Sequence, residues 1–131
     1  MSPVSGVVVD TSVWIDFFAG RPAPELEAAL QAGWVVLPPV VVAELVSGAR
    51  RPGERAAIAR LVAELLIHDT PPQHWIRVGE LRRQLSEKGL AVSTPDAHVA
   101  QCALERSAVL LSRDVIFGRI AAHCPLRVRA G

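Results

Sequence analysis

Four carboxylates stand where secondary-structure elements are expected to begin or end. Asp10 and Asp114 each follow directly on a short apolar run, and Asp96 comes behind a Thr-Pro pair typical of a helix start. Glu44 lies in an expected helix that begins at a Pro-Pro break. If these elements share one end of a sheet, the four acids meet there.

Clustered carboxylates need positive charge nearby. At about 4 Å and an effective dielectric constant near 20, each like-charge pair costs on the order of 4 kcal/mol. A fold therefore keeps such a cluster only when protons or cations neutralise it. Mg²⁺ and Mn²⁺ prefer oxygen ligands, and they can activate a water and clamp the oxygens of a phosphodiester. The alternative is structural: Asp96 and Asp114 cap helices, and Glu44 is simply solvated.

The strands that position the acids are short and apolar. Val7-Val8-Val9 is typical of a strand buried on both faces in a parallel sheet, and Ala108–Leu111 has the same character. Brief strands are also expected at 34–37 and 126–128, with a short edge strand near Ile67. The carboxyl ends of parallel strands form the crevice in which ligands bind, so Asp10 and Asp114 are expected to line it.

Helical patterns fill the segments between the strands. Proline and glycine punctuation predicts helices over residues 12–18, 25–30, 40–49, 53–66, 75–85, 95–105 and 115–122. The run Val40-Val41-Val42 can instead extend the preceding strand, although Ala43-Glu44-Leu45 favours a helix. This alternation predicts an α/β fold, with a mostly parallel sheet flanked by helices, as a single domain over residues 1–131.

Composition limits the possible partners and compartment. The 131 residues carry a formal net charge of +1, so any nucleic-acid binding must use a local patch. Cys102 and Cys124 are too few for a disulfide framework or a zinc site, and Cys102 is expected to be a small buried residue. With no cationic leader in residues 1–4 and no apolar stretch of roughly 20 residues, we expect a cytoplasmic protein without a membrane segment.

Segments 8–16, 39–45, 94–100 and 111–117, which contain the four acids, resemble those of the PIN-domain ribonucleases and, among these, the VapC-type toxins of toxin–antitoxin pairs. The resemblance covers essentially the whole chain and includes the order and spacing of the acids. Any one of the motifs is weak evidence, but four in the same order in so small a chain are specific.

The resemblance implies a three-layer PIN-like fold and an endoribonuclease that depends on Mg²⁺ or Mn²⁺. It implies that Asp10, Glu44, Asp96 and Asp114 hold the metal and activate water, and that the hydroxyls of Thr11 and Ser12 orient the first acid or a metal-bound water. It also implies a structured RNA substrate (tRNA or rRNA), a cognate antitoxin that covers the site, and a homodimer. The helices between Val40 and Leu66 offer an apolar surface for that pairing.

One position departs from the family pattern. Members often carry a further acid two residues after the fourth, and Ile116 stands there in this chain. A second metal is then held weakly, or only once RNA supplies phosphate oxygens. The alternative function is a catalytically weak PIN-like binding module that acts with an antitoxin. A phosphatase with Asp10 as the nucleophile would need an acid in the place of Ser12, and this argues against it.

The remaining polar and aromatic residues are expected to be structural or solvated. We expect Asp16 to cap a helix or to pair with an arginine. Arginines at 50, 51 and 113 can contact RNA phosphates or lie in solvent. Trp14 and Trp34 are expected in the core rather than stacked on bases. The histidines show no metal-ligand spacing and are interpreted as incidental: His68, His74, His98 and His123.

Overall fold

The computed structural model describes residues 6–131 and contains one sheet of five parallel strands. In space the strands run in the order β3-β2-β1-β4-β5, and every pairing is parallel. Their bounds are β1 (Val7–Val9), β2 (Val35–Leu37), β3 (Leu66–Ile67), β4 (Val109–Leu111) and β5 (Arg127–Arg129). The predicted mostly parallel α/β architecture is confirmed.

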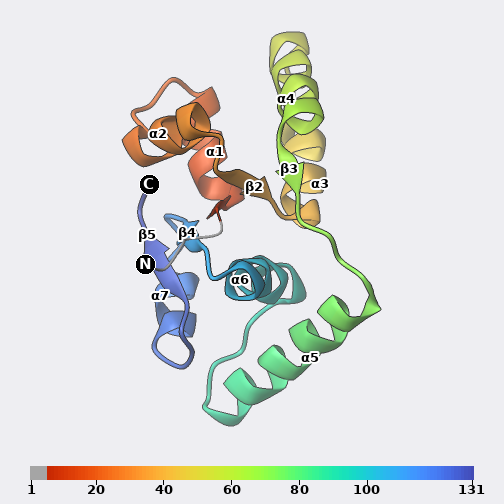
Figure 1. Cartoon of the computed structure of the whole chain (residues 1–131), viewed down its shortest axis with the longest axis vertical. Helices are drawn as coiled ribbons and strands as arrows, with labels where there is room; N and C mark the ends of the chain where they lie inside the picture. The colour runs from red at the N-terminus through yellow and green to blue at the C-terminus, as the bar shows by residue number, and fades with distance from the viewer. Residues whose placement is uncertain (1–5) are drawn as a thin grey trace.

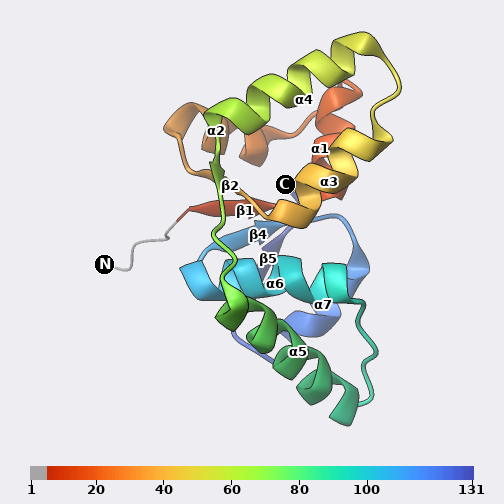
Figure 2. The same cartoon turned by 90° about the vertical axis from the view of Figure 1, so that its right-hand side faces the viewer.

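Helices cover both faces of this sheet, which gives three layers (Figures 1 and 2). Helices α1 to α4 lie on one side, and α5 to α7 lie on the other (Figure 2). In the described residues the helices are α1 (Thr11–Phe18), α2 (Pro24–Ala32), α3 (Pro39–Gly48), α4 (Pro52–Glu64), α5 (Pro72–Glu87), α6 (Thr94–Arg106) and α7 (Val115–Ala121).

The core lies on both faces of β1 and β4. Val8, Val9 and Leu110 have no exposed surface, as the apolar runs predict for central strands. Trp14 of α1 and Phe117 of α7 are also fully buried. Helix α6 is buried throughout residues 97–103, and it packs against β1 and β4.

The chain changes direction across the sheet between β1 and β4. From β1 it proceeds through β2 to β3 on one side, whereas β4 and β5 lie on the other. Such a switch point opens a crevice at the carboxyl ends of the strands. Helices α1, α3 and α7 begin at this edge because each follows a strand, and α6 begins there because it leads back into β4.

The structure confirms the helix predicted at residues 40–42, which belong to α3 and do not extend the strand. It corrects other expected boundaries. Helix α4 ends at Glu64, and Leu66 belongs to β3 because it pairs with Val36. Of the residues of α4 only Ile58 is buried, because this helix lies at the margin of the molecule (Figure 1).

One aromatic prediction was wrong. Trp14 lies in the core as expected, but Trp34 has 60% of its surface exposed.

Among residues 6–131, none of the helices combines the length and the apolar character that a membrane crossing requires. Two expectations involve residues 1–5: that one domain spans residues 1–131, and that the chain has no cationic leader. These residues lie outside the described ones, so both expectations stay predictions.

Candidate active site

Asp10 is buried at the carboxyl end of β1, and two serine hydroxyls hold it. Its Oδ2 accepts hydrogen bonds from Ser12 Oγ at 3.0 Å and from Ser112 Oγ at 2.9 Å. Because Val9 pairs with Leu111, Ser112 follows β4 at the same level at which Asp10 follows β1. The sequence analysis did not identify Ser112 as a site residue. Its position directly after a second buried strand, like that of Asp10 after the first, was a signal that could have identified it.

Thr11 brings Glu44 to the same edge of the sheet. Its Oγ1 donates a 2.7 Å hydrogen bond to Oε1 of Glu44. The contact spans the start of α1 and the middle of α3, two helices that pack together on one side of the sheet. Glu44 therefore lies beside the residue that follows Asp10.

Asp96 and Asp114 complete the group of acids. Burial, and then the negative charges of Asp114 and Asp10, raise the pKa of the Asp96 carboxyl above its usual value. The Asp96 carboxyl is therefore near enough to Asp114 and to Asp10 for their charges to act on it. Asp114 also caps α7, because its Oδ1 accepts a 3.1 Å hydrogen bond from the Ile116 N–H. The N-cap of α6 is Ser93, whose Oγ accepts a 3.2 Å hydrogen bond from the Asp96 N–H, and a hydrogen bond with Ser93 also lowers the pKa of the Asp96 carboxyl in part.

No salt bridge in the described part of the chain involves Asp10, Glu44, Asp96 or Asp114. Within the same residues, hydrogen bonds occupy Oδ2 of Asp10, Oε1 of Glu44 and Oδ1 of Asp114. The second oxygen of each of these carboxylates remains available as a metal ligand. A set of hard oxygen donors without a protein cation fits a divalent ion such as Mg²⁺ or Mn²⁺.

Asp16 is a contrasting case. It is paired with Arg21 at 2.6 Å and with Arg113, and the hydrogen bond from Arg21 lowers its pKa more than any other contact. Arg113 also donates to the carbonyl oxygens of Pro22 and Ala130. The expected arginine pair of Asp16 is confirmed, and the Arg113 side chain is engaged within the protein.

Two other sequence interpretations can be examined in the structure. Ile116 is half-buried and packs against the core, so that position adds no carboxylate to the site.

The interpretation of the histidines as incidental was wrong for three of the four, since His68, His74 and His98 are buried together. Among the described residues, ligand atoms of His68, His74 and Cys102 lie within 4.8 Å of one another, the spacing of a possible ion-binding cluster.

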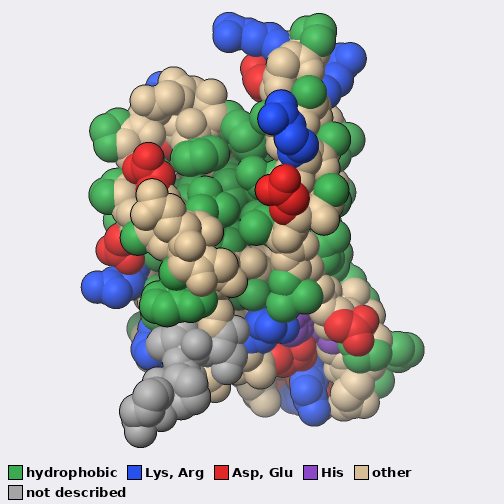
Figure 3. Space-filling view, turned by 45° about the horizontal axis from the view of Figure 1, so that its top comes forward, with side chains coloured by type: hydrophobic (Ala, Val, Ile, Leu, Met, Phe, Trp, Pro, Cys, Tyr) green, Lys and Arg blue, Asp and Glu red, His purple; other side chains and the backbone are tan. Residues whose placement is uncertain are grey.

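An apolar groove of about 350 Å³ opens next to the Thr11–Glu44 contact. It is lined by α1, α3 and the first half of α4, with Ile15, Phe18 and Leu45 among its apolar residues. Figure 3 shows hydrophobic side chains gathered in the hollow beside α4. Ile15 has 57% of its surface exposed, so this face presents an unusually open apolar surface.

Fold and site together define a class: a parallel α/β domain that gathers carboxylates at its switch point. The family description that matches residues 7–123 is the PIN domain, and the chain belongs to that family. The resemblance inferred from the four acidic segments is therefore confirmed.

Curated relatives and solved structures agree with this assignment. The chain is 30% identical over 113 residues to "Ribonuclease VapC2" of Haemophilus influenzae. The aligned region spans 82% of this chain and 86% of that protein. Among solved structures, VapBC2 from Rickettsia felis bound to a promoter DNA fragment has a TM-score of 0.74 and 22% identity, covering 94% of this chain and 96% of that chain. VapBC-1 from nontypeable Haemophilus influenzae has a TM-score of 0.73 and 20% identity, with the same coverage.

Proposed function

We propose that the protein is a Mg²⁺- or Mn²⁺-dependent endoribonuclease toxin of the VapC type that a cognate antitoxin neutralises. The observation that supports this proposal is that Ser112 hydrogen-bonds both Asp10 and the backbone of Asp114 at the switch point, with Asp96 near enough for both charges to raise its pKa. None of the salt bridges in the described residues involves these three acids. The similarity to proteins named ribonuclease VapC supports the choice of RNA as the substrate.

Asp10, Glu44, Asp96 and Asp114 would hold the ion. Bound there, it would supply the positive charge and Lewis acidity that activate a water and stabilise a phosphodiester under attack. Ser12 and Ser112 fix the plane of the Asp10 carboxylate, which leaves Oδ1 available as a ligand. Thr11 fixes Oε1 of Glu44 in the same way.

The Asp96 carboxyl links ion binding to a proton. Without a cation, burial and its acidic neighbours favour the protonated carboxyl. Metal ligands must be deprotonated, so ion binding is coupled to proton release from Asp96. Metal affinity is therefore expected to increase with pH through the range in which Asp96 titrates.

The apolar groove between α1 and α4 supports an antitoxin partner. A peptide segment with apolar side chains would bury Ile15 and Phe18 and would reach Glu44 at the end of the groove. Solved structures similar to this chain include a toxin–antitoxin complex from Klebsiella pneumoniae and a member of the VapBC family of toxin–antitoxin systems. An antitoxin in this position would block RNA from the acidic site.

We also propose a homodimer, formed through α3 and α4. Val46 has 59% of its surface exposed, and with Val42 and Val62 it lines a second apolar hollow. Covering this surface with a second copy would remove apolar area from water.

The test of the proposed function is RNA cleavage by the purified protein. Transfer RNA and ribosomal RNA are incubated with it in Mg²⁺, in Mn²⁺ and in EDTA, alongside Asp10→Asn and, as a control, Asp69→Asn at an exposed position. We expect cleavage by the wild type and the control with either metal, and none in EDTA or by Asp10→Asn. Cleavage that persists unchanged in Asp10→Asn would refute the proposal. Tight antitoxin binding without cleavage of any RNA would favour the binding-module alternative.

A further inference from the structure

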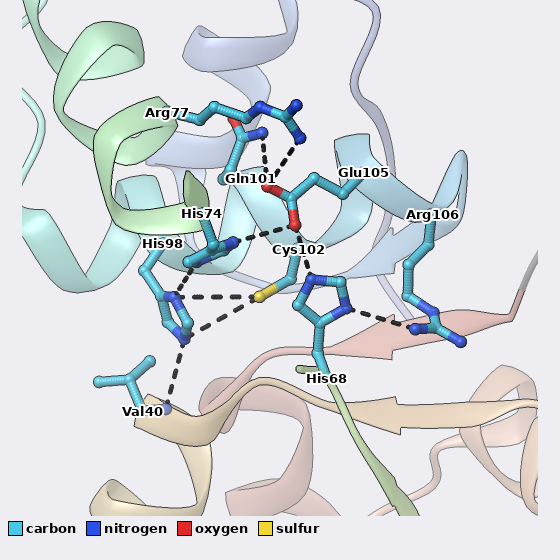
Figure 4. Close-up of polar contacts among 9 residues, drawn as sticks. All are labelled: Val40, His68, His74, Arg77, His98, Gln101, Cys102, Glu105 and Arg106. Carbon is cyan, nitrogen blue, oxygen red and sulfur yellow. Dashed lines mark hydrogen bonds and ion pairs between the residues drawn. The ribbon is translucent and has the colours of Figure 1, made fainter. Parts of the chain in front are cut away.

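Three histidines and one glutamate form a largely buried polar cluster (Figure 4). His98 and Glu105 come from α6, His74 from the first turn of α5, and His68 from the segment after β3. His98 is completely buried, and His74 is 1% exposed. Buried imidazole nitrogens need hydrogen-bond partners, so the direction of each bond in the cluster can be derived.

The chain of hydrogen bonds begins at a backbone amide. The N–H of Val40 can only donate, and it points to Nε2 of His98 at 3.5 Å, so this nitrogen is the acceptor. The His98 proton is therefore on Nδ1 and is donated to Nε2 of His74 at 2.7 Å. His74 then donates from Nδ1 to Oε1 of Glu105 at 3.0 Å.

A second branch ends at the same carboxylate. Arg106 can only donate, and it lies 3.4 Å from Nδ1 of His68, so His68 carries its proton on Nε2. That N–H donates to Oε1 of Glu105 at 2.8 Å, and Gln101 donates to Oε2 at 3.0 Å. Glu105 is thus the acceptor at the end of both branches, and all three histidines are neutral.

These directions argue against a metal ion in the cluster, although His68, His74 and Cys102 are close enough to be considered. An ion on the nitrogens that face Glu105 would displace their protons to the opposite ring nitrogens. On the His68 branch the displaced proton would then face the N–H of Arg106. On the other branch the proton on His74 Nε2 would force the His98 proton onto Nε2, where it would face the N–H of Val40. Burial also raises the pKa of the Cys102 thiol, which disfavours a thiolate ligand.

The donor at the start of the chain belongs to the first turn of α3. A helix leaves its first N–H groups without internal partners. The N-cap of α3 is Pro38, whose side chain has no acceptor, and Pro39 has no N–H. Val41 and Val42 donate to the Pro38 carbonyl, so the N–H of Val40 is left for His98. His98 therefore caps α3 from a different helix.

This cap joins the two helices that carry proposed metal ligands. Glu44 lies in α3, one turn beyond Val40, and Asp96 lies in α6, two residues before His98. The ring of Trp75 stacks on the His98 ring with centroids 4.7 Å apart and so restricts its rotation. We infer that His98 is a positioning residue: it caps α3 from α6 and holds Glu44 in place relative to Asp96, while His74 and Glu105 fix its tautomer. The inference rests on the proposed metal site.

The first measurement needs no nuclease activity. Long-range ¹H–¹⁵N spectra of the wild-type imidazoles should show His98 protonated on Nδ1 alone, and the Val40 amide should be protected from hydrogen exchange. A His98 proton on Nε2, or a Val40 amide that exchanges like an exposed one, would overturn the inference. So would a stoichiometric zinc ion in the purified protein, which would assign the cluster to a metal.

The second measurement compares two polar substitutions of His98. The amide oxygen of His98→Gln can reach the position of Nε2 and accept from Val40, whereas the shorter side chain of His98→Asn cannot. We expect His98→Asn to weaken Mn²⁺ binding roughly 10-fold, the usual size of an outer-shell effect, with exchange at Val40 accelerated. His98→Gln should restore both properties. His123→Asn, at an exposed histidine, is the matched control.

The outcomes separate this inference from the proposed function. Mn²⁺ binding by His98→Asn equal to that of the wild type overturns the inference, even if the wild type cleaves RNA. A wild type that binds Mn²⁺ but cleaves no RNA refutes the proposed function, while the response of His98→Asn still decides the positioning role. A wild type that binds no Mn²⁺ removes the site and the inference with it.

Discussion

The hydroxyl of Thr11 donates a 2.7 Å hydrogen bond to Oε1 of Glu44, 33 positions further along the chain. Because the bond is exposed, its net contribution to stability is small, about 1 kcal/mol or less. Its effect on geometry is larger, since it fixes a flexible glutamate next to the strand end that carries Asp10. The bond therefore matters more for the orientation of a ligand than for the stability of the fold.

Thr11→Val removes this donor while keeping the shape of the side chain. We expect Mn²⁺ affinity and RNA cleavage to fall roughly 10-fold, as for other groups that orient a metal ligand. The free energy of unfolding should change by no more than about 1 kcal/mol. Isothermal titration with Mn²⁺ and urea denaturation measure the two effects. Thr11→Ser keeps the hydroxyl and should resemble the wild type. Equal metal affinity in Thr11→Val and Thr11→Ser would show that Glu44 needs no such support.

Asp96→Asn should stabilise the metal-free protein. The raised pKa of Asp96 means that folding disfavours its charged form, so the wild type loses stability as pH rises through the titration of this carboxyl. The amide removes that loss, so we expect the variant to be more stable than the wild type at pH 7 in EDTA. Urea denaturation measures the gain. Mg²⁺ should stabilise the wild type but not this variant. A variant less stable than the wild type in EDTA would contradict the repulsion inferred among the acids.

The acidic site could be anticipated from sequence because three of the four acids, Asp10, Asp96 and Asp114, lie at element boundaries. The apolar runs before Asp10 and Asp114 identify two buried strands, and parallel strands place their carboxyl ends at one edge. For Glu44 and Asp96, pattern alone left helix capping or solvation as alternatives. Their place beside the other acids depends on how α3 and α6 pack, which local sequence does not specify.

The histidine cluster could not be anticipated in the same way. His68, His74 and His98 come from three separate elements, so no spacing along the chain connects them. One signal was available: Gln101 and Glu105 follow His98 at helical spacing on α6, which is otherwise rich in small apolar residues. Trp34 is expected in the core because the pattern predicts a strand from residue 34, but β2 begins at Val35 and Trp34 remains exposed.

Glu105 should make the protein sensitive to acid. Burial alone would raise the pKa of this carboxyl, but the bonds from His74, His68 and Gln101 outweigh burial and lower it to about 2. Between pH 4.5 and 2 the unfolded chain then binds more protons than the folded protein, so stability falls as pH falls through this range. The loss is at most about 3 kcal/mol.

Urea denaturation at a series of pH values tests the contribution of Glu105. Glu105→Gln cannot titrate at this position, so its stability should change less between pH 5 and pH 3 than that of the wild type. Glu87→Gln removes an exposed carboxylate that pairs with Arg83, and it should keep the wild-type pH dependence. If Glu105→Gln keeps the full wild-type slope, the acid sensitivity originates elsewhere.

Ile15→Asp should release the toxin from its antitoxin without affecting catalysis. Ile15 is exposed in the apolar groove, and its side chain is not one of the proposed ligands. A charge there would have to be buried by an apolar antitoxin segment, which costs several kcal/mol and weakens binding by at least 100-fold. Calorimetry with the cognate antitoxin measures the affinity, and cleavage of RNA by the free toxin should be unchanged. Ile76→Asp, at an exposed apolar residue of α5 on the other side of the sheet, is the control and should bind normally. Wild-type affinity in Ile15→Asp would place the antitoxin on another surface.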